Sequence, residues 1–302
     1  MKRWQRLTLA FLISVLLVGI SALLTITRNE AHDLITAPMS TRNLPERSPA
    51  DYGLEYEDVT VITPDGLKLV GWYIQSENGA AVIVQHGYKA DREELLNEAE
   101  MLARHGYGVL LTTVRAHDYS EGEQIYFGLK EMQDLEAWYQ YLLTRSDVDA
   151  ERIGILGNSY GGMLAIQYAA QNQQIKAVVA NSAFSSLNDT VETSVAYFTG
   201  LPPFPFVPLI VFWAEQESGF RSEDVDATKW IGEISPRPVF LMQGGADIII
   251  SDSSGQRLYD AAGEPRELWF EPDLGHVDFD TVLAEEYETR VIAFFDQYLL
   301  GK

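Results

Sequence analysis

The segment Gly157 to Gly161, with the sequence Gly-Asn-Ser-Tyr-Gly, constrains the fold more than any other part of this chain. It follows the short apolar run Arg152 to Leu156, which is bounded by turn residues and is typical of a buried parallel strand. Small and apolar residues with helical spacing follow, from Met163 to Gln171. A serine on so sharp a turn is strained, and its flanking glycines are needed where a Cβ would collide with neighbouring elements. We therefore predict a strand, a tight turn that exposes Ser159, and a helix.

Strands and helices are predicted to alternate from residue 59 to the C-terminus. Val59–Ile62 and Leu67–Ile74 flank Pro64-Asp65-Gly66, which is the turn chemistry of a β-hairpin. The other predicted strands are 81–85, 107–114, 153–156, 177–180, 239–243 and 266–270. Helical segments between and after them include 92–104, 129–144 and 285–299. This alternation predicts an α/β fold with a mostly parallel central sheet and helices on both faces.

Residues 185–235 interrupt the alternation, and we interpret them as an inserted helical lid. The region separates two predicted strands and holds four prolines between Pro202 and Pro208. Its aromatic residues include Tyr197, Phe198, Phe204, Phe206, Phe212 and Trp213. These side chains either line an acyl or aryl pocket, since binding sites are mostly apolar, or pack the lid onto the body of the domain. Membrane contact is a further alternative.

The N-terminus holds 21 residues without a charge, from Leu7 to Thr27, and roughly 20 apolar residues span a bilayer core. Three basic residues precede this span, so we expect a cytoplasmic N-terminus and an exported domain. A cleaved signal peptide, with Gly19 and Ser21 before the cut, is the alternative, although its apolar segment is usually only about 7 to 15 residues long. The predicted organisation is a cytoplasmic segment and anchor at 1–28, a linker at 29–50 and the α/β domain at 51–302.

Length and charge limit the classes of protein that fit. The 302 residues suffice for one large α/β domain with an insertion. The formal net charge is −22, and without the first 28 residues, which hold four basic and no acidic side chains, it is −26. Such an acidic surface repels the phosphate backbone, so no nucleic-acid partner is expected. The sequence leaves the oligomeric state open.

Several kinds of chemistry are not indicated by the sequence. Cysteine is absent, which excludes disulfides and a thiolate nucleophile. No His, Asp and Glu residues show metal-ligand spacing, and no phosphate-binding Gly-rich loop is present. We therefore predict neither a metal nor another cofactor.

A serine hydroxyl is a poor nucleophile at neutral pH, so Ser159 needs a base within hydrogen-bond reach and a carboxylate that orients the base. His276 follows the last predicted strand, and Asp247 follows the strand before it. Both lie just beyond the C-terminal end of a strand, where sites form in open parallel sheets. The order Ser159, Asp247, His276 predicts a catalytic triad, with Asp252 and Asp278 as competitors for the acid.

Two backbone amides are predicted to bind the oxyanion of a tetrahedral intermediate, which needs hydrogen-bond donors. The amide of Tyr160 directly follows the nucleophile. The second candidate is the amide of Tyr88, which follows the predicted strand 81–85 in the sequence Gln-His-Gly-Tyr. Gly87 lets this loop turn tightly, and His86 is expected to shape it.

The remaining titratable residues of interest are interpreted as structural or receive no role. Glu131 and Asp134 lie on the helix after Gly128 and are expected to be structural. No role is predicted for the histidines His32, His105 and His117.

Together, the serine turn, the His86-Gly87 loop, Asp247, His276 and the placement of the lid resemble the α/β-hydrolase superfamily over roughly residues 52 to 300. The chain more narrowly resembles membrane-anchored bacterial hydrolases related to the serine aminopeptidase and dienelactone hydrolase groups. Relatives often carry Asp-X-Arg-Gly-His-Gly-X-Ser after the fourth strand, whereas residues 113–120 here read Thr-Val-Arg-Ala-His-Asp-Tyr-Ser. Because the nucleophile is serine, the resemblance to dienelactone hydrolases, which use cysteine, does not extend to the mechanism.

The resemblance and the residues together imply a serine hydrolase that cleaves a small-molecule or acyl substrate through an acyl-enzyme. Carboxylic esters are the expected substrates, with thioesters and amides as alternatives. A serine peptidase or aminopeptidase remains open, as does a noncatalytic binding protein on the same fold, because fold alone does not establish function.

Overall fold

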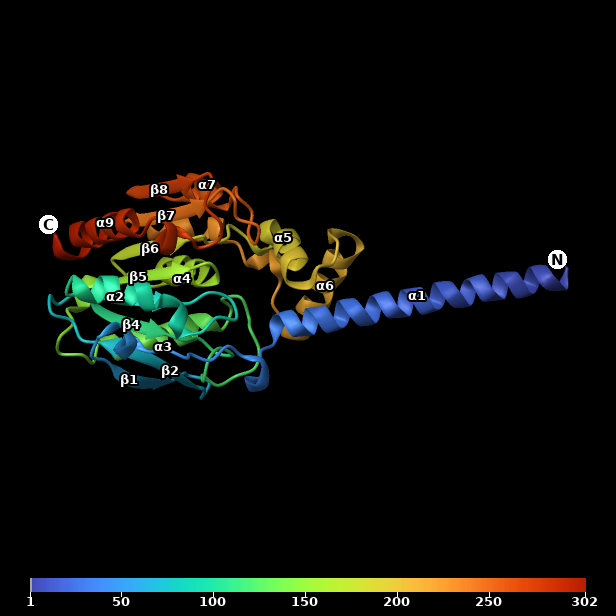
Figure 1. The fold of residues 1–302 in the computed structure, drawn as a ribbon, viewed down its shortest axis with the longest axis horizontal. Coiled ribbons are helices and arrows are strands. Elements are labelled where there is room, and N and C mark those ends of the chain that lie inside the picture. Colours follow the sequence, from blue (N-terminus) through green and yellow to red (C-terminus); the bar gives the residue numbers. More distant parts are fainter. Residues whose placement is uncertain (1) are drawn as a thin grey trace.

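A twisted eight-stranded sheet forms the centre of the computed structural model, which describes residues 2–302 (Figure 1). Its strands are β1 (Glu57–Ile62), β2 (Lys68–Ile74), β3 (Ala81–Gln85), β4 (Gly108–Thr112), β5 (Ile153–Asn158), β6 (Ala177–Asn181), β7 (Val239–Gly244) and β8 (Arg266–Glu271). Their order in the sheet is β1-β2-β4-β3-β5-β6-β7-β8. β2 is antiparallel to β1 and β4, and the other neighbours are parallel. The predicted hairpin and the mostly parallel sheet are therefore confirmed.

The register of the parallel strands aligns their carboxyl ends. Gln85 of β3 lies opposite Gly157 of β5, and Asn158 of β5 lies opposite Asn181 of β6. The last residues of β7 and β8 are also paired. The loops that follow β3, β5, β7 and β8 consequently emerge at the same edge of the sheet, which is where parallel α/β sheets form their sites.

Helices cover both faces of the sheet, as predicted. They are α2 (Leu96–Arg104), α3 (Glu131–Leu142), α4 (Tyr160–Gln171), α7 (Ser254–Ala261), the short α8 (Phe279–Val282) and α9 (Ala284–Phe295). α3, α4 and α7 share one apolar core with alternate strand residues such as Ile83, and α2 and α9 share the other core with residues such as Val84. Because neighbouring strand residues point to opposite faces, the apolar runs of the sequence fill both cores. The predicted helix at 92–104 begins with a 3₁₀ turn over Arg92–Leu95.

The lid consists of two helices, α5 (Leu187–Thr199) and α6 (Pro203–Ser218), whose axes meet at 103°. An antiparallel bridge between Ser186 and Asp226 closes its base, where the Leu187 amide donates to the Val225 carbonyl at 2.9 Å. Residues 227–234 then form two short 3₁₀ turns, and the second of these packs against α4. The lid that projects from the body is therefore residues 187–225, within the predicted 185–235.

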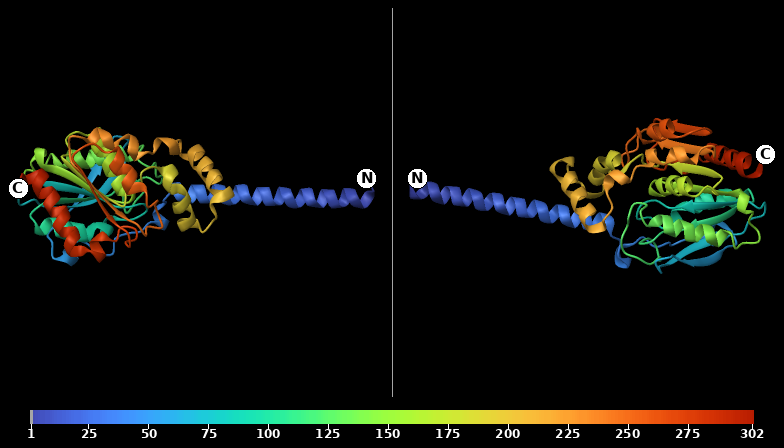
Figure 2. Two further views of the ribbon diagram at one scale, coloured as in Figure 1. Left: turned by 90° about the horizontal axis from the view of Figure 1, so that it is seen from above. Right: turned by 180° about the vertical axis from the view of Figure 1, so that it is seen from behind.

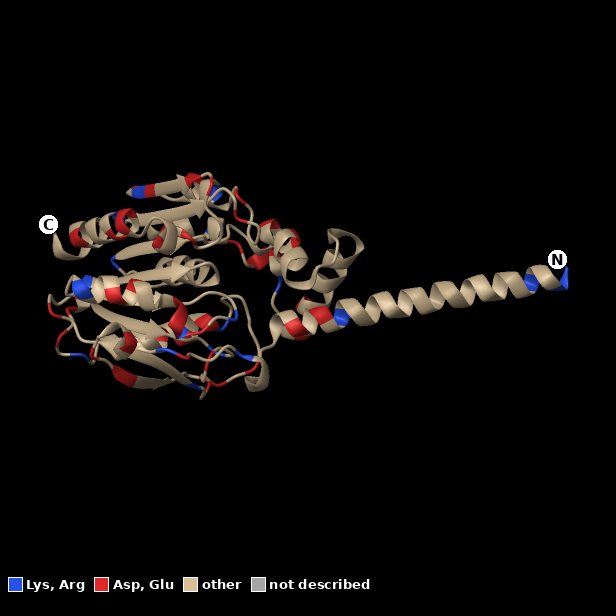
Figure 3. Cartoon of the chain, in the orientation of Figure 1, with Lys and Arg blue, Asp and Glu red and all other residues tan. Residues whose placement is uncertain are grey.

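A single helix, α1 (Arg3–Ile35), projects from the domain (Figures 1 and 2). Within residues 2–302 it is the one unbroken helix long and apolar enough to cross a membrane, a property that a signal sequence shares. Basic residues mark its free end and charged residues recur where it reaches the domain, with a long uncharged stretch between them (Figure 3).

α1 extends beyond its predicted end at residue 28, so residues 29–35 of the expected linker are helical. Packing explains the extension, because Thr27, Ala31 and Ile35 recur every four residues as a buried stripe and α1 packs against α6 of the lid. Residues 36–52 contain two short 3₁₀ turns, and Thr36 forms an isolated antiparallel bridge with Gln124.

Candidate active site

The nucleophile elbow is a turn of one residue between β5 and α4. β5 ends at Asn158, α4 begins at Tyr160, and Ser159 between them adopts φ 54° and ψ −116°. Positive φ is uncommon for a residue with a side chain and persists only where the surrounding structure enforces it. Here the Ser159 amide donates to the Asn181 carbonyl of β6 at 2.7 Å, and the Ser159 carbonyl accepts from Met163 of α4 at 3.1 Å.

The glycines around Ser159 are required by close backbone contacts. A Cβ at Gly157 would lie 2.2 Å from the Gly161 carbonyl oxygen, and a Cβ at Gly161 would lie 2.1 Å from the Gln85 carbonyl oxygen. Both distances are far below van der Waals contact, and both opposing atoms belong to the backbone. The start of α4 therefore lies directly on the ends of β5 and β3.

We expect Gly161→Ala to lower the free energy of unfolding by about 3 kcal/mol or more, since overpacking a rigid site costs 1–3 kcal/mol and this contact cannot relax by a side-chain rotation. The thermal unfolding midpoint of the full-length protein in detergent, followed by tryptophan fluorescence, measures the effect. Gly19→Ala is the control, because a Cβ at Gly19 meets no atom within 4 Å. Equal midpoints for the two variants would contradict the packing argument.

Ser159, His276 and Asp247 form one hydrogen-bonded chain. His276 Nε2 lies 2.8 Å from Ser159 Oγ, and His276 Nδ1 lies 2.6 Å from Asp247 Oδ2. The imidazole N–H at Nδ1 donates to the carboxylate, which leaves Nε2 to accept from the serine hydroxyl. The Asp247 carboxylate is inaccessible to solvent, whereas the His276 side chain remains 16% exposed.

Asp247 is held in place by the turn that follows it. Its Oδ1 accepts from the amides of Ile249 at 2.8 Å and Ile250 at 3.0 Å, so the carboxylate cannot rotate away from His276 without losing both bonds. The competing acids lie elsewhere: Asp252 is exposed, and Asp278 Oδ2 accepts from the Gly275 amide at 3.1 Å. Of the three candidate acids, Asp247 is therefore the one that contacts the histidine.

The two predicted oxyanion amides come from different elements. Tyr160 is the first residue of α4, so its amide has no intrahelical acceptor and contributes to the positive end of the helix dipole. The amides on either side of Tyr88 are both occupied, because Gly87 donates to Glu94 Oε2 at 2.5 Å and Lys89 donates to His117 Nε2 at 3.0 Å. No hydrogen bond from the Tyr88 or Tyr160 amide to another atom is found across residues 2–302.

Glu94 and His117 thus position the loop that carries Tyr88, although neither was predicted to have a role. His117 Nδ1 donates to the Arg115 carbonyl at 2.8 Å, which fixes Nε2 as an acceptor, and burial lowers the pKa of His117 well below its usual value. His86, as expected, bonds within its own loop, to the Gly87 carbonyl at 2.8 Å, and burial lowers its pKa to about 4.

The acidic residues interpreted as structural do hold loops together. Asp134 accepts from the buried Arg115 guanidinium at 2.7 Å, and the same guanidinium reaches Asp65 in the β1–β2 turn at 2.8 Å. Glu131 accepts from the amides of Tyr126 at 2.7 Å and Gly128 at 2.9 Å. None of these contacts involves Ser159 or His276.

A buried polar network that was not predicted lies behind the elbow. Glu98 of α2 is fully buried and accepts from Asn158 Nδ2 at 3.0 Å, and Asn158 directly precedes Ser159. Asn181 Nδ2 donates to Asn158 Oδ1 at 3.3 Å, the Ser182 hydroxyl donates to Asn181 at 3.3 Å, and the Val277 amide donates to Ser182 Oγ at 3.1 Å. This network links α2 to Asn158, which precedes Ser159, and to Val277, which follows His276.

Burial raises the pKa of Glu98 from 4.5 to about 8. Between about pH 4.5 and pH 8 the folded protein therefore holds a proton that the unfolded chain has released, so this residue makes stability fall as pH rises. We expect Glu98→Gln to reduce the decline of the unfolding midpoint across this window, and the amide oxygen can still accept from Asn158. Glu55→Gln, at an exposed position, should keep the wild-type decline. An unaltered pH dependence in Glu98→Gln would contradict the assignment.

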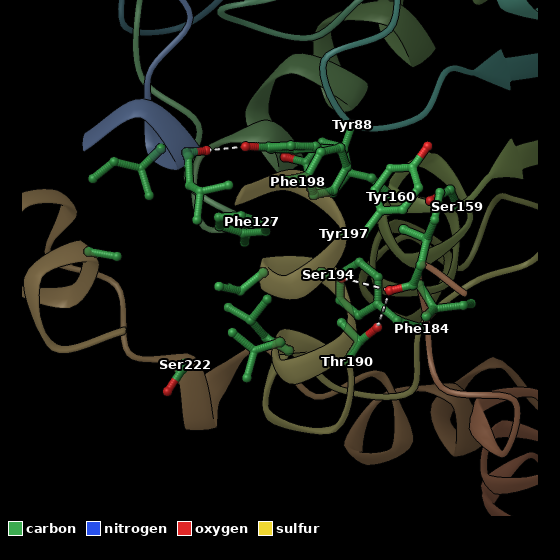
Figure 4. Close-up of a pocket in the computed structure, with 18 of the residues that line it drawn as sticks. Tyr88, Phe127, Ser159, Tyr160, Phe184, Thr190, Ser194, Tyr197, Phe198 and Ser222 are labelled. Atoms are coloured by element: carbon green, nitrogen blue, oxygen red, sulfur yellow. Dashed lines mark hydrogen bonds between the residues drawn. The ribbon is translucent and has the colours of Figure 1, made fainter. Parts of the chain in front are cut away.

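A mainly apolar cavity of about 290 Å³ lies between the elbow and the lid (Figure 4). Ser159, His276 and Tyr88 line its reactive end, and Leu34, Ile35, Phe127, Phe184, Tyr197, Phe198, Ile210, Val211, Ala214 and Phe220 are among its apolar walls. Of the lid aromatics singled out in the sequence, Tyr197 and Phe198 line the cavity, and Phe206 and Trp213 are partly buried against the core. Phe204 and Phe212 are exposed and do neither. Each of the first two interpretations therefore applies to part of the lid.

Hydroxyl groups of α5 join the lid to the loop of Asp247. Thr193 Oγ1 and Ser194 Oγ each donate to the Ile249 carbonyl at 2.9 Å. The amide of the same residue donates to Asp247, so the lid and the acid are connected through one peptide segment. Across residues 2–302, no group of three or more His, Asp or Glu side chains is arranged to hold a metal ion.

Comparisons with known proteins agree with this architecture. The family model of the X-Pro dipeptidyl-peptidases (S15 family) matches residues 57–203. An uncharacterized protein of Mycobacterium tuberculosis is 32% identical over 225 residues, which cover 73% of this chain and 72% of the relative. The uncharacterized protein YfhR of Salmonella typhi is 28% identical over 268 residues, which cover 82% and 84%. An esterase of Pyrococcus furiosus has a similar structure, with a TM-score of 0.74, 29% identity and coverage of 88% of this chain and 98% of its own.

A mostly parallel eight-stranded sheet with a serine at the strand-to-helix elbow is the architecture of the α/β hydrolases. The chain belongs to the α/β-hydrolase superfamily and is a serine hydrolase of that superfamily.

Proposed function

We propose that this protein is a carboxylic ester hydrolase in which Ser159, His276 and Asp247 form the catalytic triad. His276 Nε2 takes the hydroxyl proton as Ser159 Oγ attacks the ester carbonyl, and Asp247 stabilises the imidazolium that forms. The hydrogen-bonded chain from Ser159 through His276 to Asp247 is the observation that carries this proposal. The proton acceptor, His276 Nε2, lies within hydrogen-bond reach of the Ser159 hydroxyl.

The amides of Tyr88 and Tyr160 donate hydrogen bonds to the carbonyl oxygen as negative charge develops on it. His276 then protonates the leaving alcohol, which departs and leaves the acyl group on Ser159 Oγ. A water molecule, deprotonated by His276, then attacks the acyl carbonyl, the bond to Ser159 Oγ breaks, and His276 returns the proton to Ser159 Oγ as the carboxylic acid leaves. The apolar cavity favours an acyl group over a charged group, and the similarity to an esterase of Pyrococcus furiosus supports an ester substrate.

Ser159→Ala should abolish labelling by a fluorophosphonate probe and hydrolysis of p-nitrophenyl butyrate. Asp247→Asn should lower kcat by roughly 10³- to 10⁴-fold because it favours the wrong tautomer of His276, and the fold should survive. Gel fluorescence and steady-state kinetics measure the two effects. Equal labelling of wild type and Ser159→Ala would contradict the nucleophile, and absence of labelling in folded wild type would favour a noncatalytic binding protein.

A peptidase is the second candidate, and one residue favours it. Glu94 is the acidic residue that lines the cavity, and a carboxylate near the reacting serine suits a peptide with a free amino terminus. The partial match to the X-Pro dipeptidyl-peptidase family agrees with this alternative. However, Glu94 is exposed to solvent, and it already accepts from the Gly87 amide. We therefore favour a role in holding the Tyr88 loop.

Substitutions of Glu94 separate the two candidates. For the esterase, Glu94→Ala should lower kcat on p-nitrophenyl butyrate by about tenfold or more because the Tyr88 loop loses its acceptor, and Glu94→Gln should cost less because its amide oxygen still accepts. A peptidase would instead cleave Ala-Pro-p-nitroanilide and lose that activity equally in both variants, since neither keeps the negative charge. The measurement is kcat and KM on both substrates.

We also propose that α1 anchors the protein in a membrane, with the N-terminus in the cytoplasm and the catalytic domain on the other side. The uncharged run of α1 is exposed, and basic residues precede it. Protease accessibility of the domain in intact cells, before and after permeabilisation, tests this orientation.

A further inference from the structure

We infer that the substrate is a membrane-resident ester with an uncharged head group, and that its acyl chain enters the cavity beside the foot of α1. This inference rests on the proposed esterase function and on the proposed anchor. The observation behind it is the lining of the cavity. Ser159 and His276 line one part, and Leu34 and Ile35 from the last turn of α1 line another. The acyl pocket and the candidate membrane helix therefore share a wall.

The end of α1 is fixed to the domain by contacts on several sides. Its buried stripe packs against α6, and His32 Nδ1 lies 2.5 Å from Glu217 Oε1 of that helix. The Tyr88 hydroxyl donates to the Leu34 carbonyl, which joins α1 to the residue whose amide we assign to the oxyanion (Figure 4). The Ile125 amide donates to the Ile35 carbonyl at 2.8 Å. α1 thus sets the position of the cavity relative to the membrane.

The length of α1 sets the distance between the cavity wall and the hydrocarbon core of the membrane. At a rise of about 1.5 Å per residue, the 21 uncharged residues from Leu7 to Thr27 extend about 31 Å, which matches a hydrocarbon core of about 30 Å. Ile35 follows Thr27 by eight residues, or about 12 Å, whereas a head-group layer is about 5 to 8 Å thick, so this wall of the cavity lies about 5 Å beyond the head groups. Arg28 lies over the ring of Trp213 at 5.9 Å, in the interfacial layer where aromatic residues are enriched.

The lid offers an apolar surface at the same level. α6 lies beside α1 and carries few charges (Figures 1 to 3). Phe204 and Phe212 of this helix are 82% and 48% exposed, and neither lines the cavity. Apolar side chains that are exposed next to a membrane span are buried when the helix rests on the head-group layer. The membrane itself is therefore the occupant that we assign to this surface.

Charge indicates which esters reach this site. Without the first 28 residues the chain carries −26, and anionic head groups would be repelled from so acidic a domain. An uncharged head group avoids this repulsion, and the apolar walls of the cavity receive the chain. We accordingly expect esters such as monoacylglycerols, held in the outer leaflet beside α1, to be hydrolysed faster than acidic lipids.

The test uses full-length protein reconstituted in phosphatidylcholine vesicles and two probes: water-soluble p-nitrophenyl butyrate and 4-methylumbelliferyl oleate dissolved in the same vesicles. The variant is Phe204→Asp with Phe212→Asp. Its control is Leu143→Asp, an exposed leucine at the end of α3, on the opposite edge of the sheet from the site. We expect the lid variant to lose about tenfold or more of the oleate rate, because two phenylalanine contacts with the membrane are lost, and to keep the butyrate rate. The control should keep both rates.

Two outcomes would overturn the inference: an unchanged oleate rate in the lid variant, or equal losses on both substrates. Wild type that cleaves butyrate but not vesicle-held oleate would also overturn it, while leaving the esterase proposal intact. Wild type that cleaves neither ester and resists the fluorophosphonate probe would instead refute the proposed function.

Discussion

The backbone of α4 rests on the end of β3 so closely that no side chain fits between them, and the rest of the site depends on this contact. A Cβ at Gly161 would lie 2.1 Å from the Gln85 carbonyl oxygen. Because the two backbones touch, Ser159 and the loop of Tyr88 are held side by side by main-chain atoms. The strained φ of Ser159 persists because these contacts leave the turn no relaxed alternative. Rigid elements thus fix Ser159 and the amides of Tyr88 and Tyr160 relative to each other.

Buried polar side chains fix the loops that the sheet itself does not constrain. Arg115 is 2% exposed and joins the hairpin turn, the loop after β4 and α3 through two carboxylates. Glu98 ties α2 to the residue before Ser159, and Ser182 reaches the residue after His276. Leaving a buried polar group without a hydrogen-bond partner costs free energy. Each of these bonds therefore strongly disfavours conformations in which its loop is displaced. These networks define geometry more than they add stability.

Several contributions to the site arise from contacts that no local pattern predicts. Ser159, Asp247 and His276 could be proposed because each follows a recognisable strand in a fixed order. Glu98 lies on an ordinary amphipathic helix 60 residues before Asn158. His117 matches the histidine of the pattern quoted for relatives, but that pattern does not show that its ring holds the Lys89 amide. Residues 29–35 have the composition of a linker, yet they are helical because a stripe of small and apolar side chains packs on the lid. Each of these roles depends on a partner distant in sequence.

The sequence by itself determined the fold and the turn that carries Ser159, because apolar periodicity specifies which segments become strands and helices, and glycine spacing specifies the turn. Tertiary structure decided which residues support and surround that turn. Only the folded chain shows that Asp247, not Asp252 or Asp278, contacts His276, and that Glu94 and His117 hold the Tyr88 loop. Only the folded chain places the last turn of α1 in the wall of the cavity. The physical reason is that these contacts join segments that lie far apart in the sequence and are brought together by packing. The residue pattern of either segment alone does not show that they will meet.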